Sequence, residues 1–174
     1  MVDFTSLKKE SAEVFISKKK YLALQKSDMN ELLQAAESTS RKRMRLCSHR
    51  NANESVHEMF IVHPRGAYVR PHKHVGKSES MFIIDGEVDY VIFDDAGKIK
   101  EVIKMGDYQS EKPFYHTMRI EQFHTLLIRS EHLVFLEITK GPFCRADTIF
   151  ADWSPLESDK EKVKEFIINI EKNI

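Results

Sequence analysis

The stretch from about residue 56 to 140 most constrains the fold, because its apolar residues come in short runs separated by turn-forming residues. Examples of such runs are residues 59–62, 81–84 and 133–136. These runs have the length of strands rather than helices, and no helical pattern separates them. The sequence therefore predicts a mainly β protein, with an antiparallel sandwich or barrel at its centre.

Three groups of turn-forming residues mark where the strands should reverse. They are Asp85-Gly86, residues 94–97 (Asp-Asp-Ala-Gly) and residues 129–132 (Arg-Ser-Glu-His). Asp-Gly pairs favour tight turns because glycine accepts positive φ values. We expect each group to form a hairpin turn between successive strands.

Helices are predicted before and after the β region. Asp28 and Glu31 have the spacing of a capping box, and Ser158 and Glu161 repeat it. Apolar residues at helical spacing follow each box: Met29, Leu32, Leu33 and Ala36 after the first, and Val163, Phe166, Ile167, Ile170 and Ile174 after the second. Each helix should therefore pack one apolar face on the barrel.

The 174 residues are enough for a single domain with its own core. We expect an N-terminal extension with a helix at 1–45, the barrel at 46–157 and a C-terminal helix at 158–174. Within the extension, residues 41–50 look basic and irregular. Residues 14–17 could add an edge strand, which would allow pairing with a second copy in a homodimer.

Composition excludes several classes of protein. The 27 basic and 27 acidic residues give zero net charge, which argues against a nucleic-acid or anionic lipid partner. No apolar run approaches the roughly 20 residues that span a bilayer, and the start lacks the order of a secretory signal. Cys47 and Cys144 are too few for a disulfide framework. We expect a cytoplasmic protein with two buried thiols.

Residues 72–79 carry the clearest chemical signal. His72 and His74 stand two residues apart, so on a strand they share one face, at a separation of about 6–7 Å. Glu79 follows a short segment that could fold back toward them. Two imidazoles and one carboxylate are typical ligands of a catalytic divalent metal ion.

The spacing of five residues around this segment resembles the first signature of the cupin superfamily. Gly66, His72, His74, Glu79 and Gly86 occupy its fixed positions. The resemblance implies a small antiparallel barrel, or jelly roll, with a metal ion at its centre. Cupins add a further histidine from a later strand. Here His124 is the preferred fourth ligand, because it follows an expected strand after a short break and opens the next hairpin. The Pro and Gly that usually precede the cupin histidine are missing before His124, so His116 stays as the alternative.

A narrower resemblance covers residues 28–157. The chain is similar to the WbuC-type cupin-fold metalloproteins in several segments: 40–43, His49, 68–74, 93–97, 137–143 and 150–155. This resemblance implies a bacterial source and a role in building lipopolysaccharide O-antigen or another surface polysaccharide. The resemblance does not indicate which reaction, if any, the protein catalyses.

Four residues are candidates for binding a substrate. Arg41 and Arg43 could grip phosphate with their fixed fork of donors, although a solvated basic loop would look the same. Tyr68 and Arg70 have the strand parity of His72 and His74 and could point into the barrel mouth. An arginine that leaves the barrel at its rim is the alternative for Arg70.

The sequence thus predicts a metal-dependent protein that acts on a sugar or nucleotide-sugar. The divalent ion (zinc, iron, manganese, nickel or cobalt) would polarise a substrate oxygen or activate water for isomerisation, epimerisation or hydrolysis. The rival hypotheses are a non-catalytic saccharide-binding or sensor barrel and an Fe(II)-dependent oxygenase. No catalytic residue beyond the metal ligands is indicated.

Overall fold

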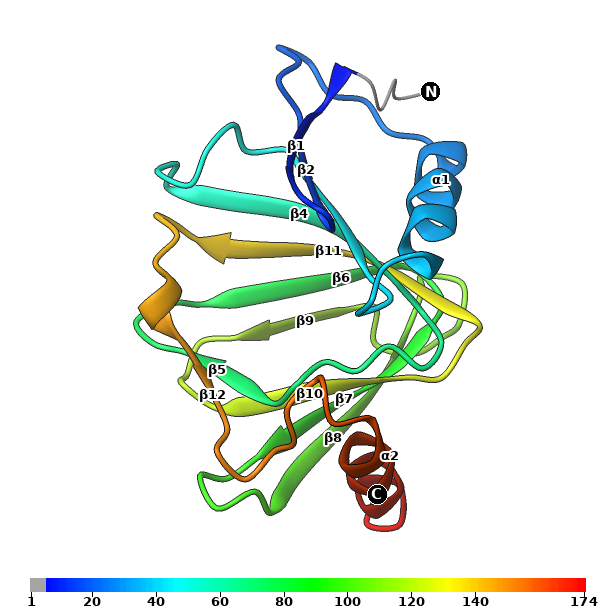
Figure 1. Cartoon of the computed structure of the whole chain (residues 1–174), viewed down its shortest axis with the longest axis vertical. Helices are drawn as coiled ribbons and strands as arrows, with labels where there is room; N and C mark the ends of the chain where they lie inside the picture. Colours follow the sequence, from blue (N-terminus) through cyan, green and yellow to red (C-terminus); the bar gives the residue numbers. More distant parts are fainter. Residues whose placement is uncertain (1–5) are drawn as a thin grey trace.

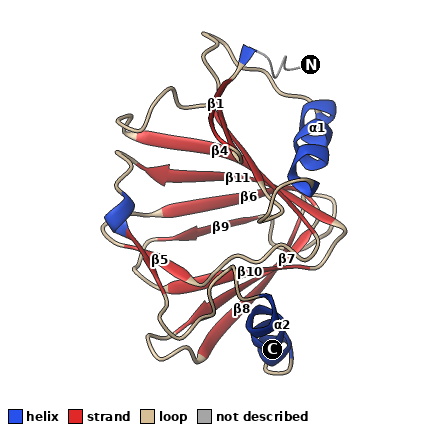
Figure 2. Ribbon diagram, in the orientation of Figure 1, coloured by secondary structure: helices blue, strands red, loops and turns tan. Residues whose placement is uncertain are grey.

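The computed structural model describes residues 6–174, which form two facing β-sheets with one helix outside each (Figure 1). The seven-stranded sheet runs β1 (Lys8–Ser11), β2 (Val14–Ile16), β3 (Met44–Cys47), β4 (Val56–Pro64), β11 (His132–Lys140), β6 (Glu79–Asp85) and β9 (Tyr115–Met118). The five-stranded sheet runs β12 (Thr148–Phe150), β5 (His72–His74), β10 (Phe123–Ile128), β7 (Glu87–Phe93) and β8 (Ile99–Gly106). Strands dominate the chain, as Figure 2 shows, and the predicted mainly β class is confirmed.

Two of the three predicted hairpin turns instead carry the chain from one sheet to the other. Asp85-Gly86 joins β6 to β7, and residues 129–132 join β10 to β11, but neither pair of strands lies in one sheet. Only residues 94–97 form a hairpin, between the paired strands β7 and β8. The sheet changes let β6 and β7 face each other across the barrel, so their side chains meet in its interior.

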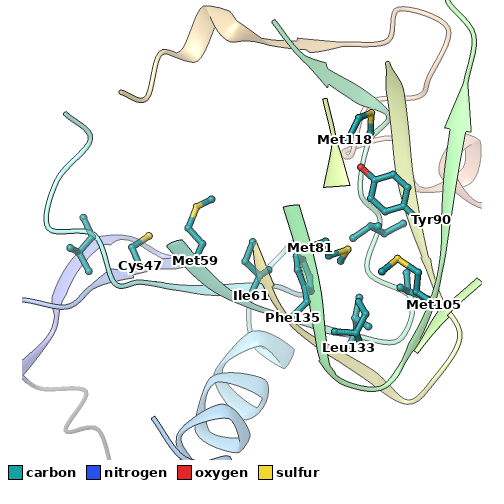
Figure 3. Close-up of a cluster of buried hydrophobic side chains, with 13 residues drawn as sticks. Cys47, Met59, Ile61, Met81, Tyr90, Met105, Met118, Leu133 and Phe135 are labelled. Carbon is teal, nitrogen blue, oxygen red and sulfur yellow. The ribbon is translucent and has the colours of Figure 1, made fainter. Parts of the chain in front are cut away.

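The interior is built from alternate residues of the strands. On β4, Met59 and Ile61 face into the barrel, whereas Phe60 and Val62 face the helix α1 (Lys26–Glu37). In Figure 3, Cys47 and Met59 lie on one side of the interior and Tyr90 on the other. This alternation means that any polar residue at an inward position lines the space between the sheets.

Both predicted helices form, with caps displaced from the predicted ones. Gln25 caps α1, and its backbone N–H donates to Asp28 at 2.8 Å, so Asp28 is the third helical residue of a capping box rather than the cap itself. Helix α2 (Lys160–Glu171) is capped by Asp159, whose side chain accepts from the Lys162 N–H, in place of Ser158. Each helix packs its apolar face on one sheet: α1 on β3 and β4, and α2 on the five-stranded sheet.

The N-terminal region is part of the sheet. β2 pairs with β1 on one side and with β3 on the other, so residues 14–16 form an internal strand and β1 takes the edge. β3 lies within residues 41–50, which were expected to be irregular. Its alternating residues Met44 and Leu46 are buried against α1, and this burial outweighs the basic character of the segment. The boundary expected after residue 45, between the N-terminal extension and the barrel, therefore falls inside β3.

Within residues 6–174 no helix has both the length and the apolar character needed to cross a membrane.

Replacing Gly86 with alanine should destabilise the protein strongly. Gly86 has a φ of 97°, and an added Cβ would collide with the backbone carbonyl oxygen of His132 at the sheet change. We expect a loss of about 3 kcal/mol in the free energy of unfolding, measured by denaturant titration. Gly66→Ala is the matched control, because Gly66 also has a positive φ of 82° but has no atom within 4 Å of the added Cβ. It should cost about 1 kcal/mol, and equal losses would contradict the role assigned to the Gly86 contact.

Candidate metal centre

Three histidines converge on the inner face of the five-stranded sheet. His72 and His74 lie on β5, and His124 lies on the neighbouring strand β10, directly opposite His72 in the register. One ring nitrogen from each histidine lies within 4.8 Å of the others. The ring centroids of His72 and His124 are 4.6 Å apart, and those of His72 and His74 are 5.0 Å apart. The structure thus brings His124 to the predicted pair, from a strand 50 residues later in the chain.

Backbone carbonyls fix the tautomers of two of these rings. The Nδ1 atom of His72 lies 2.9 Å from the carbonyl oxygen of Arg70, and that of His124 lies 3.1 Å from the carbonyl oxygen of Gln122. A carbonyl oxygen only accepts, so each Nδ1 must carry the proton and donate it. The Nε2 lone pairs remain available, as they are in metal-binding histidines whose other ring nitrogen donates to a carbonyl or carboxylate oxygen.

Glu79 reaches the histidines from the facing sheet. Its Oε2 atom lies 3.0 Å from Nε2 of His74, and its Oε1 atom lies 3.6 Å from Nε2 of His124. The hydroxyl of Tyr90, on β7, donates to Oε1 at 3.4 Å. Glu79 is only 7% exposed, and among residues 6–174 the close polar contact of its Oε2 atom is the ring of His74. An under-satisfied buried carboxylate oxygen beside imidazole nitrogens fits a site that takes a cation.

Burial and neighbouring charges set the protonation of the cluster. Burial, reinforced by the other two histidines, lowers the pKa of His72 to about 3, and burial also lowers the pKa of His124. Both rings are therefore neutral at pH 7 and in the form that binds metal. Burial opposes the charged forms of His74 and Glu79, but their contact outweighs it, raising the pKa of His74 and lowering that of Glu79 to about 2. Three imidazoles and one carboxylate suit a borderline divalent ion.

His116, the alternative ligand, lies apart from this cluster. It is on β9, and its ring packs against that of Tyr90 at a centroid distance of 4.6 Å. Its Nε2 atom is buried without a partner in the described part of the chain. The nitrogen atoms close enough to share an ion belong to His72, His74 and His124, so the geometry favours His124 as the later histidine.

A cavity of about 220 Å³ extends from the histidines between the two sheets. The apolar part of its lining includes Met59, Met81 and Ile61, which are drawn in Figure 3. Its polar lining includes Glu137 of β11 and Arg45 of β3. Burial and the nearby charge of Glu79 raise the pKa of Glu137 to about 7. Sequence reasoning considered Arg45 only as part of a basic cluster that could grip phosphate, and it did not single out Glu137. Alternation along each strand, Arg45 with Cys47 on β3 and Glu137 with Phe135 on β11, could have indicated that both side chains point inward.

Arg41 and Arg43, predicted to grip phosphate, both contact the buried carboxylate of Glu13. Nε of Arg41 donates to Oε1 of Glu13 at 2.9 Å, and Nε of Arg43 donates to Oε2 at 2.9 Å. A second nitrogen of Arg41 also pairs with Glu13, and a third lies 3.5 Å from Glu157. Arg43 lines the cavity and Arg41 does not. Much of the donor capacity of both guanidinium groups is thus taken within the chain.

Tyr68 and Arg70 lie in an extended loop before β5, so strand parity does not place them beside His72. The hydroxyl of Tyr68 donates to the carbonyl oxygen of Pro155 at 3.1 Å, outside the main cavity. Arg70 lines the cavity, and its guanidinium donates to Oγ of Ser154 and to the carbonyl oxygen of Ala151, both at 3.0 Å. Both side chains therefore fasten the C-terminal segment to the barrel.

Other sequence expectations have mixed outcomes. Cys47 is buried as expected, but Cys144 is exposed, because it lies in the loop that follows β11 rather than in a strand. Trp153 packs on Phe93 and Phe123, at centroid distances of 5.1 and 5.8 Å. His49, one of the positions shared with the WbuC-type proteins, stacks on His57 at a centroid distance of 4.1 Å.

The facing sheets, their terminal helices and the inward histidines define a cupin β-barrel. A family model described as a domain of unknown function, DUF6016, matches residues 24–105. A search of curated proteins found no match. Among solved structures, protein SO0799 from Shewanella oneidensis is similar with a TM-score of 0.54 and 10% identity, over 73% of this chain and 85% of that chain. This likeness concerns the fold alone.

Two further solved structures align over a shorter part. Oxalate decarboxylase of Bacillus subtilis, a protein with Mn(II) centres, is 18% identical with a TM-score of 0.45, over 56% of this chain. Procruciferin, an 11S globulin from Brassica napus, is 13% identical with a TM-score of 0.43, over 55% of this chain. The alignments cover only 24% of the decarboxylase and 22% of the globulin.

Glu13→Gln should destabilise the protein in a pH-dependent way. Burial raises the pKa of Glu13, but Arg41 and Arg43 outweigh it and hold the pKa below its ordinary value of 4.5. The stabilisation is therefore full above about pH 4.5 and is lost as the pH falls through the lower folded pKa. We expect the variant to be about 2 kcal/mol less stable at pH 7 by denaturant unfolding, with the difference shrinking toward pH 3.

Glu10→Gln is the control for this measurement, because Glu10 is exposed and, among residues 6–174, its carboxylate pairs with Lys8 alone. Its effect should stay within about 0.5 kcal/mol at every pH. A Glu13→Gln effect that did not change with pH would show that the carboxylate charge is not what holds the two arginines.

Proposed function

We propose that this protein is a metal-binding cupin that holds one divalent ion with His72, His74, His124 and Glu79. The observation that carries the proposal is the convergence of three imidazole nitrogens within 4.8 Å, two of them with their tautomers fixed by backbone carbonyls. The buried carboxylate of Glu79, whose Oε2 atom lies 3.0 Å from Nε2 of His74, completes the donor set. Imidazole and carboxylate ligands accept zinc, iron, manganese, nickel or cobalt, and the site suits any of these ions.

The bound ion would act as a Lewis acid toward an oxygen of the substrate. The chain supplies neutral imidazoles at His72 and His124 and keeps bulk water away from His124, which is 4% exposed. Tyr90 holds the orientation of Glu79 through its hydroxyl, since it donates to Oε1. These contacts position the ligands before any ion arrives.

We further propose that the substrate is a sugar or nucleotide-sugar used in bacterial surface-polysaccharide biosynthesis. The support is the WbuC-type resemblance, several segments of which border the cavity. Arg70, His72 and His74 come from residues 68–74, Glu137 and Phe143 from 137–143, and Phe150 from 150–155, and all line it. The unpaired thiols Cys47 and Cys144 fit a reducing compartment such as the cytoplasm.

Metal content tests the first proposal. Elemental mass spectrometry of untagged protein, reconstituted with each candidate ion and desalted, should give about one ion per chain in the wild type. His74→Ala and His124→Ala should lose most of it, since each removes one of few ligands. His116→Ala is the matched control and should keep its ion, because His116 lies outside the cluster.

Two outcomes would contradict the proposed site. Loss of the ion in His116→Ala with retention in His124→Ala would move the fourth ligand to β9. Absence of stoichiometric metal in the reconstituted wild type, with circular dichroism showing a folded protein, would overturn metal binding itself.

Turnover tests the proposed sugar chemistry. Metal-loaded protein incubated with a panel of nucleotide-sugars should convert at least one of them, as followed by NMR. His74→Ala should abolish the conversion, and the exposed-lysine variant Lys100→Ala should not. Binding of several nucleotide-sugars without any conversion would favour the saccharide-binding module instead.

A further inference from the structure

The cavity contains an arginine whose guanidinium has no hydrogen-bond or ion-pair partner among the described residues. Arg45 lines the cavity, and its guanidinium makes no hydrogen bond or ion pair with any of residues 6–174. The other arginines of the lining differ. Arg43 is paired with Glu13, Arg70 is bonded to Ser154 and Ala151, and Arg145 is exposed and lies over the ring of Phe150. A half-buried, unpaired guanidinium is costly unless something else satisfies it.

Strand alternation points Arg45 into the barrel. On β3, Met44 and Leu46 pack against α1, whereas Cys47 belongs to the interior cluster. Arg45 shares the parity of Cys47 and pairs in register with Ile61 of β4, which is also an interior residue. Its side chain therefore enters the space between the sheets from the side opposite the histidines.

A second charged side chain stands between Arg45 and the histidines. Glu137 of β11 lies opposite Met59 on one side and Met81 on the other, both interior residues. It lines the same cavity and makes no hydrogen bond or ion pair in the described chain. Across the sheet, the inward charged residues thus follow the order Arg45, Glu137, Glu79. A donor group and an acceptor group are both left open to a ligand.

A buried histidine adds a third open polar atom to the same space. His57 is 4% exposed and lines the cavity. Its Nε2 atom has no hydrogen-bond partner within residues 6–174, while its ring is held by stacking on His49. A buried, oriented and unpartnered nitrogen indicates that a ligand or water completes the site.

We propose that the cavity binds a small hydroxy-carboxylate, such as a sugar acid, between Arg45 and the histidine cluster. Its carboxylate would pair with the Arg45 guanidinium, and a hydroxyl would donate to Glu137. A further oxygen would face the ion held by His72, His74 and His124. This inference rests on the proposed metal site and narrows its substrate class.

The size of the cavity agrees with this class. Its volume of about 220 Å³ lies below the roughly 300–1,000 Å³ of pockets for drug-sized ligands. One sugar unit is the scale of ligand that fits. If the natural substrate is a nucleotide-sugar, only its acidic sugar would enter, and the nucleotide would stay outside the barrel.

A comparison of sugar acids with a neutral sugar that lacks the carboxylate tests the proposal. Isothermal titration of metal-loaded protein should show D-glucuronate or D-gluconate binding at least about tenfold more tightly than D-glucose, since a charge-assisted pair contributes that much. Arg45→Gln should abolish the preference, and Arg45→Lys should keep part of it. Arg65→Gln is the matched control, because Arg65 is exposed and does not line this cavity.

Metal content is measured on every variant, so that failure of the metal site and failure of the acid site are separated. Arg45→Gln should keep about one ion per chain. Equal affinity for acid and neutral sugars, absence of acid binding, or an unchanged preference in Arg45→Gln would each overturn the proposed substrate class. Loss of metal in the wild type would instead count against the metal site.

Discussion

The structure depends on the packing of three imidazoles and one carboxylate in the barrel interior, where Glu79 and His124 are buried and His72 and His74 are half-buried. Such a cluster opposes protonation of its histidines, because burial disfavours the charged rings and the rings repel one another when charged. The pKa of His72 is about 3 for this reason. Only His74, held by Glu79, keeps a raised pKa. A divalent ion bound between the histidines and Glu79 would replace the stabilisation that a proton on His74 gives to the contact between His74 and Glu79.

The two-sheet architecture is what allows these four side chains to meet. His72, His74 and His124 project from β5 and β10 of one sheet, and Glu79 projects from β6 of the other. The chain changes sheets at Asp85-Gly86 and at residues 129–132. Without these sheet changes, β6 and β7 would form a flat hairpin, and Tyr90 could not reach Glu79 across the interior.

Much of the fold and part of the site could be predicted from sequence, because those signals are local. Strand-length apolar runs predicted the β region, and the spacing of His72, His74 and Glu79 predicted residues that the structure brings together. The turns at 85–86 and 129–132 were misread, since turn-forming residues mark a change of direction but do not say whether the next strand pairs in the same sheet. The helix caps were misplaced by three residues for α1 and by one residue for α2, because several polar residues near each helix start could serve as the cap.

Partners that are distant in sequence could not be predicted. Arg41 and Arg43 are satisfied by Glu13, about 30 residues away, and nothing in a basic run indicates such a partner. Arg45 and Glu137 line one cavity only because β3, β4 and β11 are neighbours. Strand alternation could have placed each of them inward, but their shared cavity depends on the order of strands in the sheet.

X-ray absorption spectroscopy of the metal-loaded protein tests the central claim most directly, because it reports the atoms bound to the ion. The account predicts a shell of nitrogen and oxygen atoms only, at about 2.0–2.2 Å for zinc, with the outer-shell scattering of about three imidazoles. A sulfur neighbour, which Cys47 or the interior methionines would provide, would contradict it, as would a shell without imidazole.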